Sequence, residues 1–152
     1  MSEALTILLK QHQPKFHPVI KLNDTKDKIH PFNFTVTNTD ITEELIADTD
    51  NFSKYVNRQL HDAEAVYGIG GYNEDRVLYK RSKLFDGQEA RSLHLGIDIW
   101  GPLGTPVFAP LGGMLHSFAF NNNFGDYGAT IILQHNLDTT NFYTLYGHLS
   151  LS

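Results

Sequence analysis

The sequence predicts a mainly β protein, α+β overall, in which a partly helical N-terminal segment precedes a small antiparallel β sandwich or barrel-like domain. Apolar residues recur at helical spacing over about 42–64. From about residue 90 onward, short apolar or alternating runs follow one another roughly every ten residues, with turn-forming residues between them. The 152 residues, 41% of them apolar, are enough to build a hydrophobic core.

The first half of the chain, residues 1–75, is polar near its start and is interrupted there by prolines. The alternation of apolar and polar residues over 32–37 predicts a short strand. Apolar spacing predicts one helix, or two short helices with a break at 48–51, over about 42–64. We expect glycines to end this helical part, at positions 68, 70 and 71.

The second half, residues 76–152, is expected to form the β-rich domain. Runs bounded by Gly, Pro and Asn predict strands at 94–100, 106–110, 114–120, 130–135 and 142–148. The sequence stops only four residues after the last of these runs. A sheet that stops so soon after an aromatic-rich strand is typical of a domain lacking its next strand. We therefore expect a domain that is incomplete at its C-terminus and a chain that is part of a longer protein.

Composition excludes several classes of function. Twelve Lys and Arg stand against 17 Asp and Glu, and the net charge of −5 argues against a nucleic-acid partner. The absence of Cys excludes a disulfide scaffold and a thiolate nucleophile. No apolar stretch reaches the ~18 residues of a membrane span, so we expect no integral membrane segment. No signal peptide is visible, and the sequence leaves the compartment open.

His94 and Asp98 are the pair with the clearest potential for chemistry. On a straight strand they share a face but lie about 13 Å apart, too far to share an ion. They converge only if the backbone bends between them, and Gly96 permits such a bend. A neutral imidazole nitrogen and a carboxylate oxygen are ordinary zinc ligands. The alternative is an exposed histidine near a turn-capping aspartate. His135, at the end of an apolar run, is expected to be structural.

Five short motifs follow one another in a single order between about residues 90 and 152. They are His94-Leu95-Gly96-Ile97-Asp98-Ile99, Gly104-Thr105-Pro106-Val107-Phe108-Ala109-Pro110 with Gly113, Gly125-Asp126-Tyr127-Gly128, Ile131-Ile132-Leu133-Gln134-His135, and Tyr146-Gly147-His148-Leu149-Ser150. In this order they resemble the lysostaphin/LytM-type zinc metallopeptidases, which are peptidoglycan endopeptidases. The resemblance does not extend to residues 1–75.

The resemblance implies a zinc-dependent metalloendopeptidase that acts on peptidoglycan or related peptides, in which a zinc-activated water attacks the peptide carbonyl. It implies that His94 and Asp98 bind zinc and that His148 is a catalytic residue near the attacking water. In the family, a downstream His-x-His motif supplies the third zinc ligand, and this sequence has no such motif. Because a catalytic zinc needs three protein ligands, we expect the chain to be inactive by itself. The family usually acts outside the cytoplasm.

Two other interpretations stay open. The first is a non-catalytic LytM-like module with a binding or regulatory role, since some members of the family have lost their zinc ligands. The second is a sugar-phosphotransferase carrier domain, which shares the β-rich architecture and uses a phosphorylated histidine. The presence of both His94 and Asp98 argues against each of them.

Overall fold

The chain divides into two compact units that are interleaved in sequence. A computed structural model describes residues 3–23, 25–76, 93–123 and 126–151. The first unit joins residues 1–22 to residues 104–152, and the second unit consists of residues 23–103. The division expected near residue 75 rests on the sequence alone and stays a prediction. Gly125 of the third motif lies outside the described residues.

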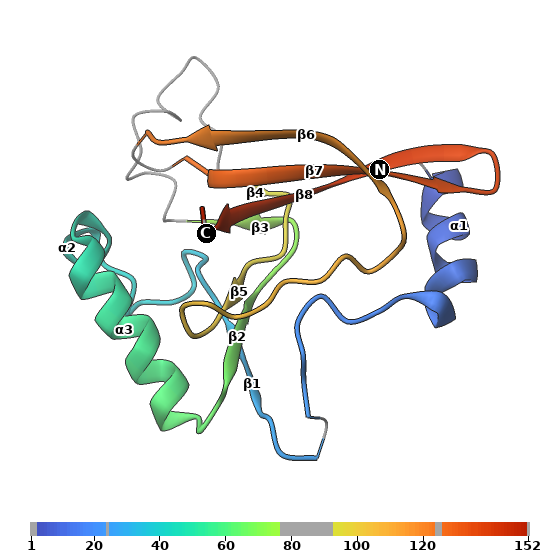
Figure 1. Cartoon of the computed structure of the whole chain (residues 1–152). Coiled ribbons are helices and arrows are strands. Elements are labelled where there is room, and N and C mark those ends of the chain that lie inside the picture. Colours follow the sequence, from blue (N-terminus) through green and yellow to red (C-terminus); the bar gives the residue numbers. More distant parts are fainter. Residues whose placement is uncertain (1–2, 24, 77–92, 124–125, 152) are drawn as a thin grey trace. The chain divides into compact units, whose positions relative to one another are not determined.

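The second unit contains a three-stranded sheet and a short two-stranded one (Figure 1). In the larger sheet, β1 (Ile29–Phe32) pairs in parallel with β2 (Tyr67–Gly70), and β2 pairs antiparallel with β5 (Ile99–Trp100). In the smaller sheet, β3 (Glu74–Asp75) pairs antiparallel with β4 (Leu93–His94), which places Glu74 directly opposite His94.

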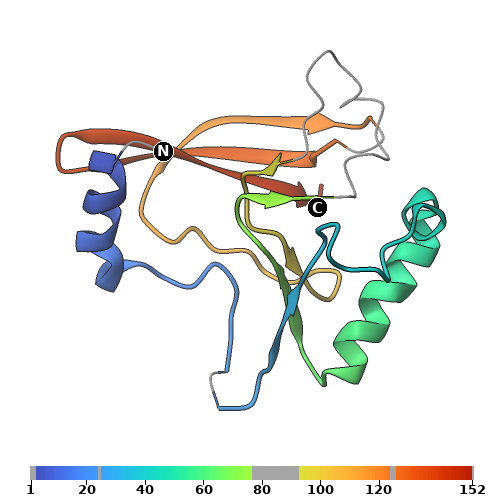
Figure 2. The same ribbon diagram turned by 180° about the vertical axis from the view of Figure 1, so that it is seen from behind.

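Two helices lie between β1 and β2, in the range where the sequence predicts one or two. Helix α2 (Glu43–Ala47) begins after Thr42, whose side chain accepts a hydrogen bond from the Leu45 amide. Helix α3 (Thr49–Asp62) begins after Asp48, whose carboxylate accepts hydrogen bonds from two amides of the first turn. These side chains satisfy amides that have no partner within the helix. Figure 2 shows α3 leading through a short turn into β2.

An aromatic cluster forms the core of the second unit. Phe34 has no exposed surface, and its ring centroid lies 5.1 Å from that of Phe32 and 5.7 Å from those of Phe52 and Trp100. Apolar side chains of α2 and α3 complete the cluster, namely Ile46 and Val56. The helices are therefore held against β1 by burial of their apolar faces, which stabilises short helices far more than intrinsic propensity does.

The first unit is built on a three-stranded antiparallel sheet. Its strands are β6 (Met114–Asn121), β7 (Gly128–Leu137) and β8 (Thr140–Leu149), paired in that order. Helix α1 (Glu3–His12) and a following 3₁₀ turn precede them in sequence, and neither is predicted from the sequence. Nε2 of His12 lies 3.3 Å from an oxygen of Asp138 in the turn between β7 and β8.

His135 has the structural role expected of it. Its ring is 1% exposed, with Nδ1 2.9 Å from the carbonyl of Gly112 and Nε2 2.7 Å from the hydroxyl of Thr144. Gly113 makes room for it, because a Cβ there would lie 2.8 Å from His135 Nδ1. The buried imidazole thus ties the segment before β6 to β7 and β8, and both ring nitrogens have partners.

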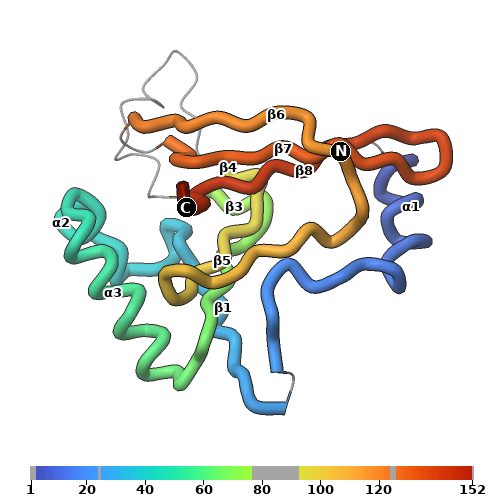
Figure 3. Tube along the Cα trace, in the orientation of Figure 1, coloured from blue at the N-terminus to red at the C-terminus, as the bar shows by residue number. Residues whose placement is uncertain are grey.

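The strand predicted at 106–110 is wrong. Proline lacks the amide hydrogen that a strand ladder needs, and Pro106 and Pro110 bracket this segment. The segment instead runs alongside residues 17–19, which belong to the same unit (Figure 3). The Phe108 amide donates to the Val19 carbonyl at 2.8 Å, and the Pro110 carbonyl accepts from the His17 amide at 2.9 Å.

The strand predicted at 32–37 is displaced, because β1 already ends at Phe32. Beyond it, the Asn33 side chain accepts hydrogen bonds from the amide and the hydroxyl of Thr35, at 3.0 and 2.7 Å. This local pairing competes with a strand ladder. The run predicted as one strand at 94–100 is likewise divided into β4 and β5.

The glycines at 68 and 70 do not end the helical part as predicted, because both lie in β2. A Cβ at Gly68 would lie 2.1 Å from the Phe32 ring, so glycine lets the two strands and the ring pack closely. The mainly β, α+β class predicted from the sequence is confirmed. Among the described residues, no helix is long and apolar enough to cross a membrane.

Replacing Phe34 with alanine should lower the free energy of unfolding by about 3–5 kcal/mol, because it leaves a cavity among three rings. Denaturation by urea, followed by the fluorescence of Trp100 in the same cluster, measures this change. Val36→Ala is the matched control, since Val36 is 67% exposed and its loss should cost less than about 0.5 kcal/mol. Equal losses for the two variants would contradict this account of the core.

Candidate metal-binding and catalytic residues

His94 and Asp98 converge at a backbone bend. Strand β4 ends at His94, β5 begins at Ile99, and the chain bends at Gly96 between them. As a result, Nε2 of His94 lies 3.4 Å from Oδ1 of Asp98. A Cβ at Gly96 would lie only 3.0 Å from that nitrogen, so glycine serves both the bend and the position of the ring. His94 and Asp98 are thus brought together by a bend at Gly96, which the sequence predicts as the condition for their convergence.

The second oxygen of Asp98 is held by an arginine. Nη1 of Arg76 donates a short charge-assisted hydrogen bond to Oδ2 of Asp98, and its Nε donates to Glu74 at 2.7 Å. The Arg76 side chain is 3% exposed, so both carboxylates are needed to offset the cost of burying its charge. One positive and two negative charges therefore leave this group of side chains with a single net negative charge.

The surroundings of His94 favour its neutral form. Burial lowers the pKa of His94, and the positive charge of Arg76 lowers it further, while Asp98 and Glu74 oppose these effects without reversing them. For Arg76, burial disfavours the charged form, but the hydrogen bonds and charges of Asp98 and Glu74 raise its pKa overall. At neutral pH the site therefore offers a neutral imidazole, which is the form in which a histidine binds a metal ion.

His148 belongs to the first unit and lies on strand β8, close to its end. The register between β7 and β8 shifts between Ala129 and Ile131, so that one residue of β7 opposes Gly147 and His148 together. His148 has a φ of 55° at this bulge, and its amide donates to the Tyr127 carbonyl at 2.6 Å. Bulges re-aim side chains and are frequent beside active sites. The bulge leaves this imidazole exposed.

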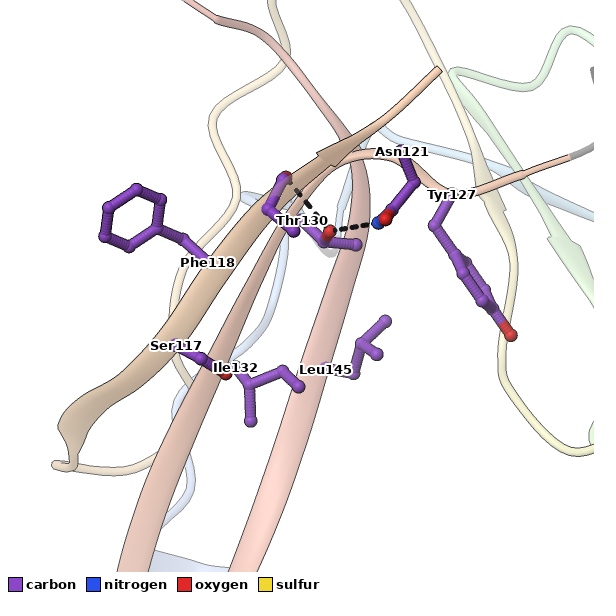
Figure 4. A pocket seen from close by; sticks show the side chains of 8 residues that line it. Ser117, Phe118, Asn121, Tyr127, Thr130, Ile132 and Leu145 are labelled. Carbon is purple, nitrogen blue, oxygen red and sulfur yellow. Dashed lines mark hydrogen bonds between the residues drawn. The ribbon is translucent and has the colours of Figure 1, made fainter. Parts of the chain in front are cut away.

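A shallow apolar hollow of about 190 Å³ lies on the same sheet (Figure 4). Thr130 is fixed beside it, because its hydroxyl donates to the Ala119 carbonyl and accepts from Nδ2 of the Asn121 side chain. Tyr127, whose carbonyl anchors His148, is also part of the lining, together with Phe118, Ile132 and Leu145. The hollow is smaller than the roughly 300–1,000 Å³ typical of ligand pockets, and it can take a single apolar side chain.

Among the described residues, no three His, Asp or Glu side chains are grouped closely enough to hold a metal ion. His94 and Asp98 therefore supply two donors. Sequence reasoning missed Glu74 and Arg76, whose roles depend on the pairing of β3 with β4. The available signal was opposite charge two residues apart, which on a strand places both side chains on one face.

The comparisons with known proteins single out the same stretch of the chain. Residues 92–151 match the model of peptidase family M23. This match covers the motifs identified in the sequence, and it confirms the resemblance to LytM-type peptidases. No solved structure matches the chain significantly.

Curated relatives share part of the chain. The proteins named DD-carboxypeptidase/endopeptidase Mpg from Neisseria meningitidis serogroup B and from Neisseria gonorrhoeae are each 32% identical to it over 95 residues. The similarity covers 59% of this chain and 21% of each relative. The chain therefore spans about a fifth of the length of the curated relatives that it matches.

The pKa of His94 should lie below 6.5, and Asp98→Asn should lower it further, because the Asp98 charge raises it. NMR titration of the ring protons measures both. The unfolded chain then takes up this proton more readily than the folded chain. The free energy of unfolding should therefore fall as the pH drops through about 6.5 toward the folded-state value. Asp75→Asn is the control, and a His94 pKa above 6.5 would contradict the prediction.

Proposed function

We propose that the protein is a zinc-dependent endopeptidase that cleaves peptides of peptidoglycan, on the premise that its residues 92–151 match the model of peptidase family M23. The observation that carries the proposal is the convergence of His94 and Asp98 at the Gly96 bend. The names of the Neisseria relatives, which include an endopeptidase activity, support the same reaction class.

The two donors fit a zinc ion. Two ligands at about 2.1 Å from one tetrahedral zinc lie about 3.4 Å apart. This is the separation between His94 Nε2 and Asp98 Oδ1. The lowered pKa of His94 keeps its nitrogen free of a proton at neutral pH, and the net negative charge of the group attracts a cation. A bound zinc would polarise the scissile carbonyl and lower the pKa of a water molecule.

Residues of the first unit supply groups that suit a peptide substrate. The exposed imidazole of His148 can move a proton or donate a hydrogen bond to an oxygen that gains negative charge. The hollow beside Tyr127 can accept an apolar side chain of the peptide. The backbone hydrogen bond from His148 to Tyr127 links the imidazole to this hollow.

Asp98→Ala in the full-length gene product should abolish release of new peptide termini from purified peptidoglycan, because a zinc ligand is lost. His148→Ala should lower the rate by about 10²–10⁴-fold while zinc stays bound. Chromatography with mass spectrometry measures the products, and elemental mass spectrometry measures the zinc. Asp75→Ala is the control, since it removes an exposed carboxylate from a neighbouring strand.

Unchanged turnover in a folded Asp98→Ala protein would reject the peptidase mechanism. A wild-type protein that binds zinc and peptidoglycan but releases no peptide would instead support a non-catalytic LytM-like module. This second function is considered because His94 and Asp98 provide only two metal donors, and no group of three is present among the described residues.

A further inference from the structure

Arg76 occupies an unusual place for a charged side chain. Its guanidinium is almost fully buried, lies 5.6 Å from the centre of the Phe34 ring, and bridges Glu74 to Asp98. A surface ion pair would contribute little and would leave both partners free to move. Here burial and two charge-assisted contacts confine the guanidinium.

Glu74 is itself fixed from two directions. Its Oε2 accepts from Arg76, and its Oε1 accepts from the Phe34 amide at 3.1 Å. Phe34 is the most deeply buried residue of the aromatic core. A continuous path of hydrogen bonds therefore runs from the core through Glu74 and Arg76 to the Asp98 carboxylate.

Gly70 makes the position of Arg76 possible. A Cβ at Gly70 would lie 2.6 Å from Nη2 of Arg76, which is closer than real Cβ contacts come. The Gly70 amide also donates to the Asp98 carbonyl at 2.9 Å, so the backbone of Asp98 is held by the strand that makes room for the guanidinium.

We propose that Glu74 and Arg76 are positioning residues that hold the Asp98 carboxylate so that Oδ1 faces His94 and is available to a metal ion. The terminal torsion of an aspartate is broad, so an unrestrained carboxylate turns freely. Pairing Oδ2 with Arg76 stops this rotation and leaves Oδ1 for the metal. This inference rests on the proposed function, because it assumes that His94 and Asp98 bind zinc.

The charge of Arg76 creates a second, opposing effect. A nearby positive charge repels Zn²⁺, so removing it would strengthen metal binding if electrostatics alone decided the affinity. Glu74 offsets this repulsion while it holds the guanidinium. Variants that keep the charge but disturb the geometry therefore separate positioning from repulsion.

Arg76→Lys and Gly70→Ala are such variants. Lysine keeps the positive charge but cannot bridge two carboxylates with a planar fork. The Cβ added by Gly70→Ala displaces the guanidinium without any change of charge. The matched controls are Arg58→Lys on the exposed face of α3 and Gly112→Ala, where an added Cβ meets open space.

Zn²⁺ titrations of the chain, followed by the NMR signals of the His94 ring, measure the affinity at this site. We expect Arg76→Lys and Gly70→Ala to weaken Zn²⁺ binding by about 10–100-fold, as loss of a partner of a metal ligand does elsewhere. Both controls should bind as the wild type does. Circular dichroism and Trp100 fluorescence in EDTA check that each variant is folded.

Unchanged or tighter Zn²⁺ binding by a folded Arg76→Lys or Gly70→Ala variant would overturn the positioning role. If Arg76 had a purely structural role, these variants would have a lower melting temperature in EDTA, but Zn²⁺ would stabilise them as much as it stabilises the wild type. His94→Ala separates the two proposals, and because it has no His94 ring, its Zn²⁺ binding is measured by the rise in melting temperature on addition of Zn²⁺. If it binds Zn²⁺ as the wild type does, the proposed metal site itself is wrong, whereas loss of binding in this variant alone rejects only the positioning role.

Discussion

The buried charge of Arg76 is the constraint on which the second unit is organised. A cation removed from water requires anionic partners, and β3 and the segment before β5 provide one carboxylate each. One of these carboxylates also binds the backbone of the aromatic core, and the other is an expected metal ligand. Packing of the core and chemistry at its edge are therefore connected through one guanidinium.

The two histidines of interest are held by different means. His94 is positioned by partial burial over a glycine bend, with opposing charges on either side. His148 is positioned by its backbone, through a bulge and a left-handed conformation that is uncommon outside glycine. The first arrangement favours the neutral form of the His94 ring, whereas the second directs the His148 ring outward. These two arrangements suit the roles proposed for the two rings, metal binding for His94 and proton transfer for His148.

Local sequence signals were sufficient for elements whose causes are local. The long strands near 114–120, 130–135 and 142–148 were predicted from alternation and turns, and Gly96 was correctly identified as the place where a bend would join His94 to Asp98. Side-chain caps at Thr42 and Asp48 explain why the helical region divides in two.

The failures concern contacts between distant residues. The glycines of β2 resemble helix terminators in the sequence, because the Phe32 ring that packs on Gly68 is 36 positions away. The role of Arg76 is not predicted for the same reason, since its partner Asp98 is 22 positions away, in the segment between β4 and β5. Residues 106–110 resemble a strand in composition, but the two prolines lack the amide hydrogens that strand pairing needs. Periodicity reports which face is apolar and carries no information about which strand lies beside it.

The interleaving of the two units has a consequence for synthesis on the ribosome. Residues 23–103 form one compact unit, so all of its sequence has been made before the strands of the other unit appear. Residues 17–19 form their backbone hydrogen bonds with residues 108–110, and they must wait for about ninety further residues to be translated. The sequence of the unit with the His94–Asp98 pair is thus available on the ribosome before the sheet that bears His148 can form.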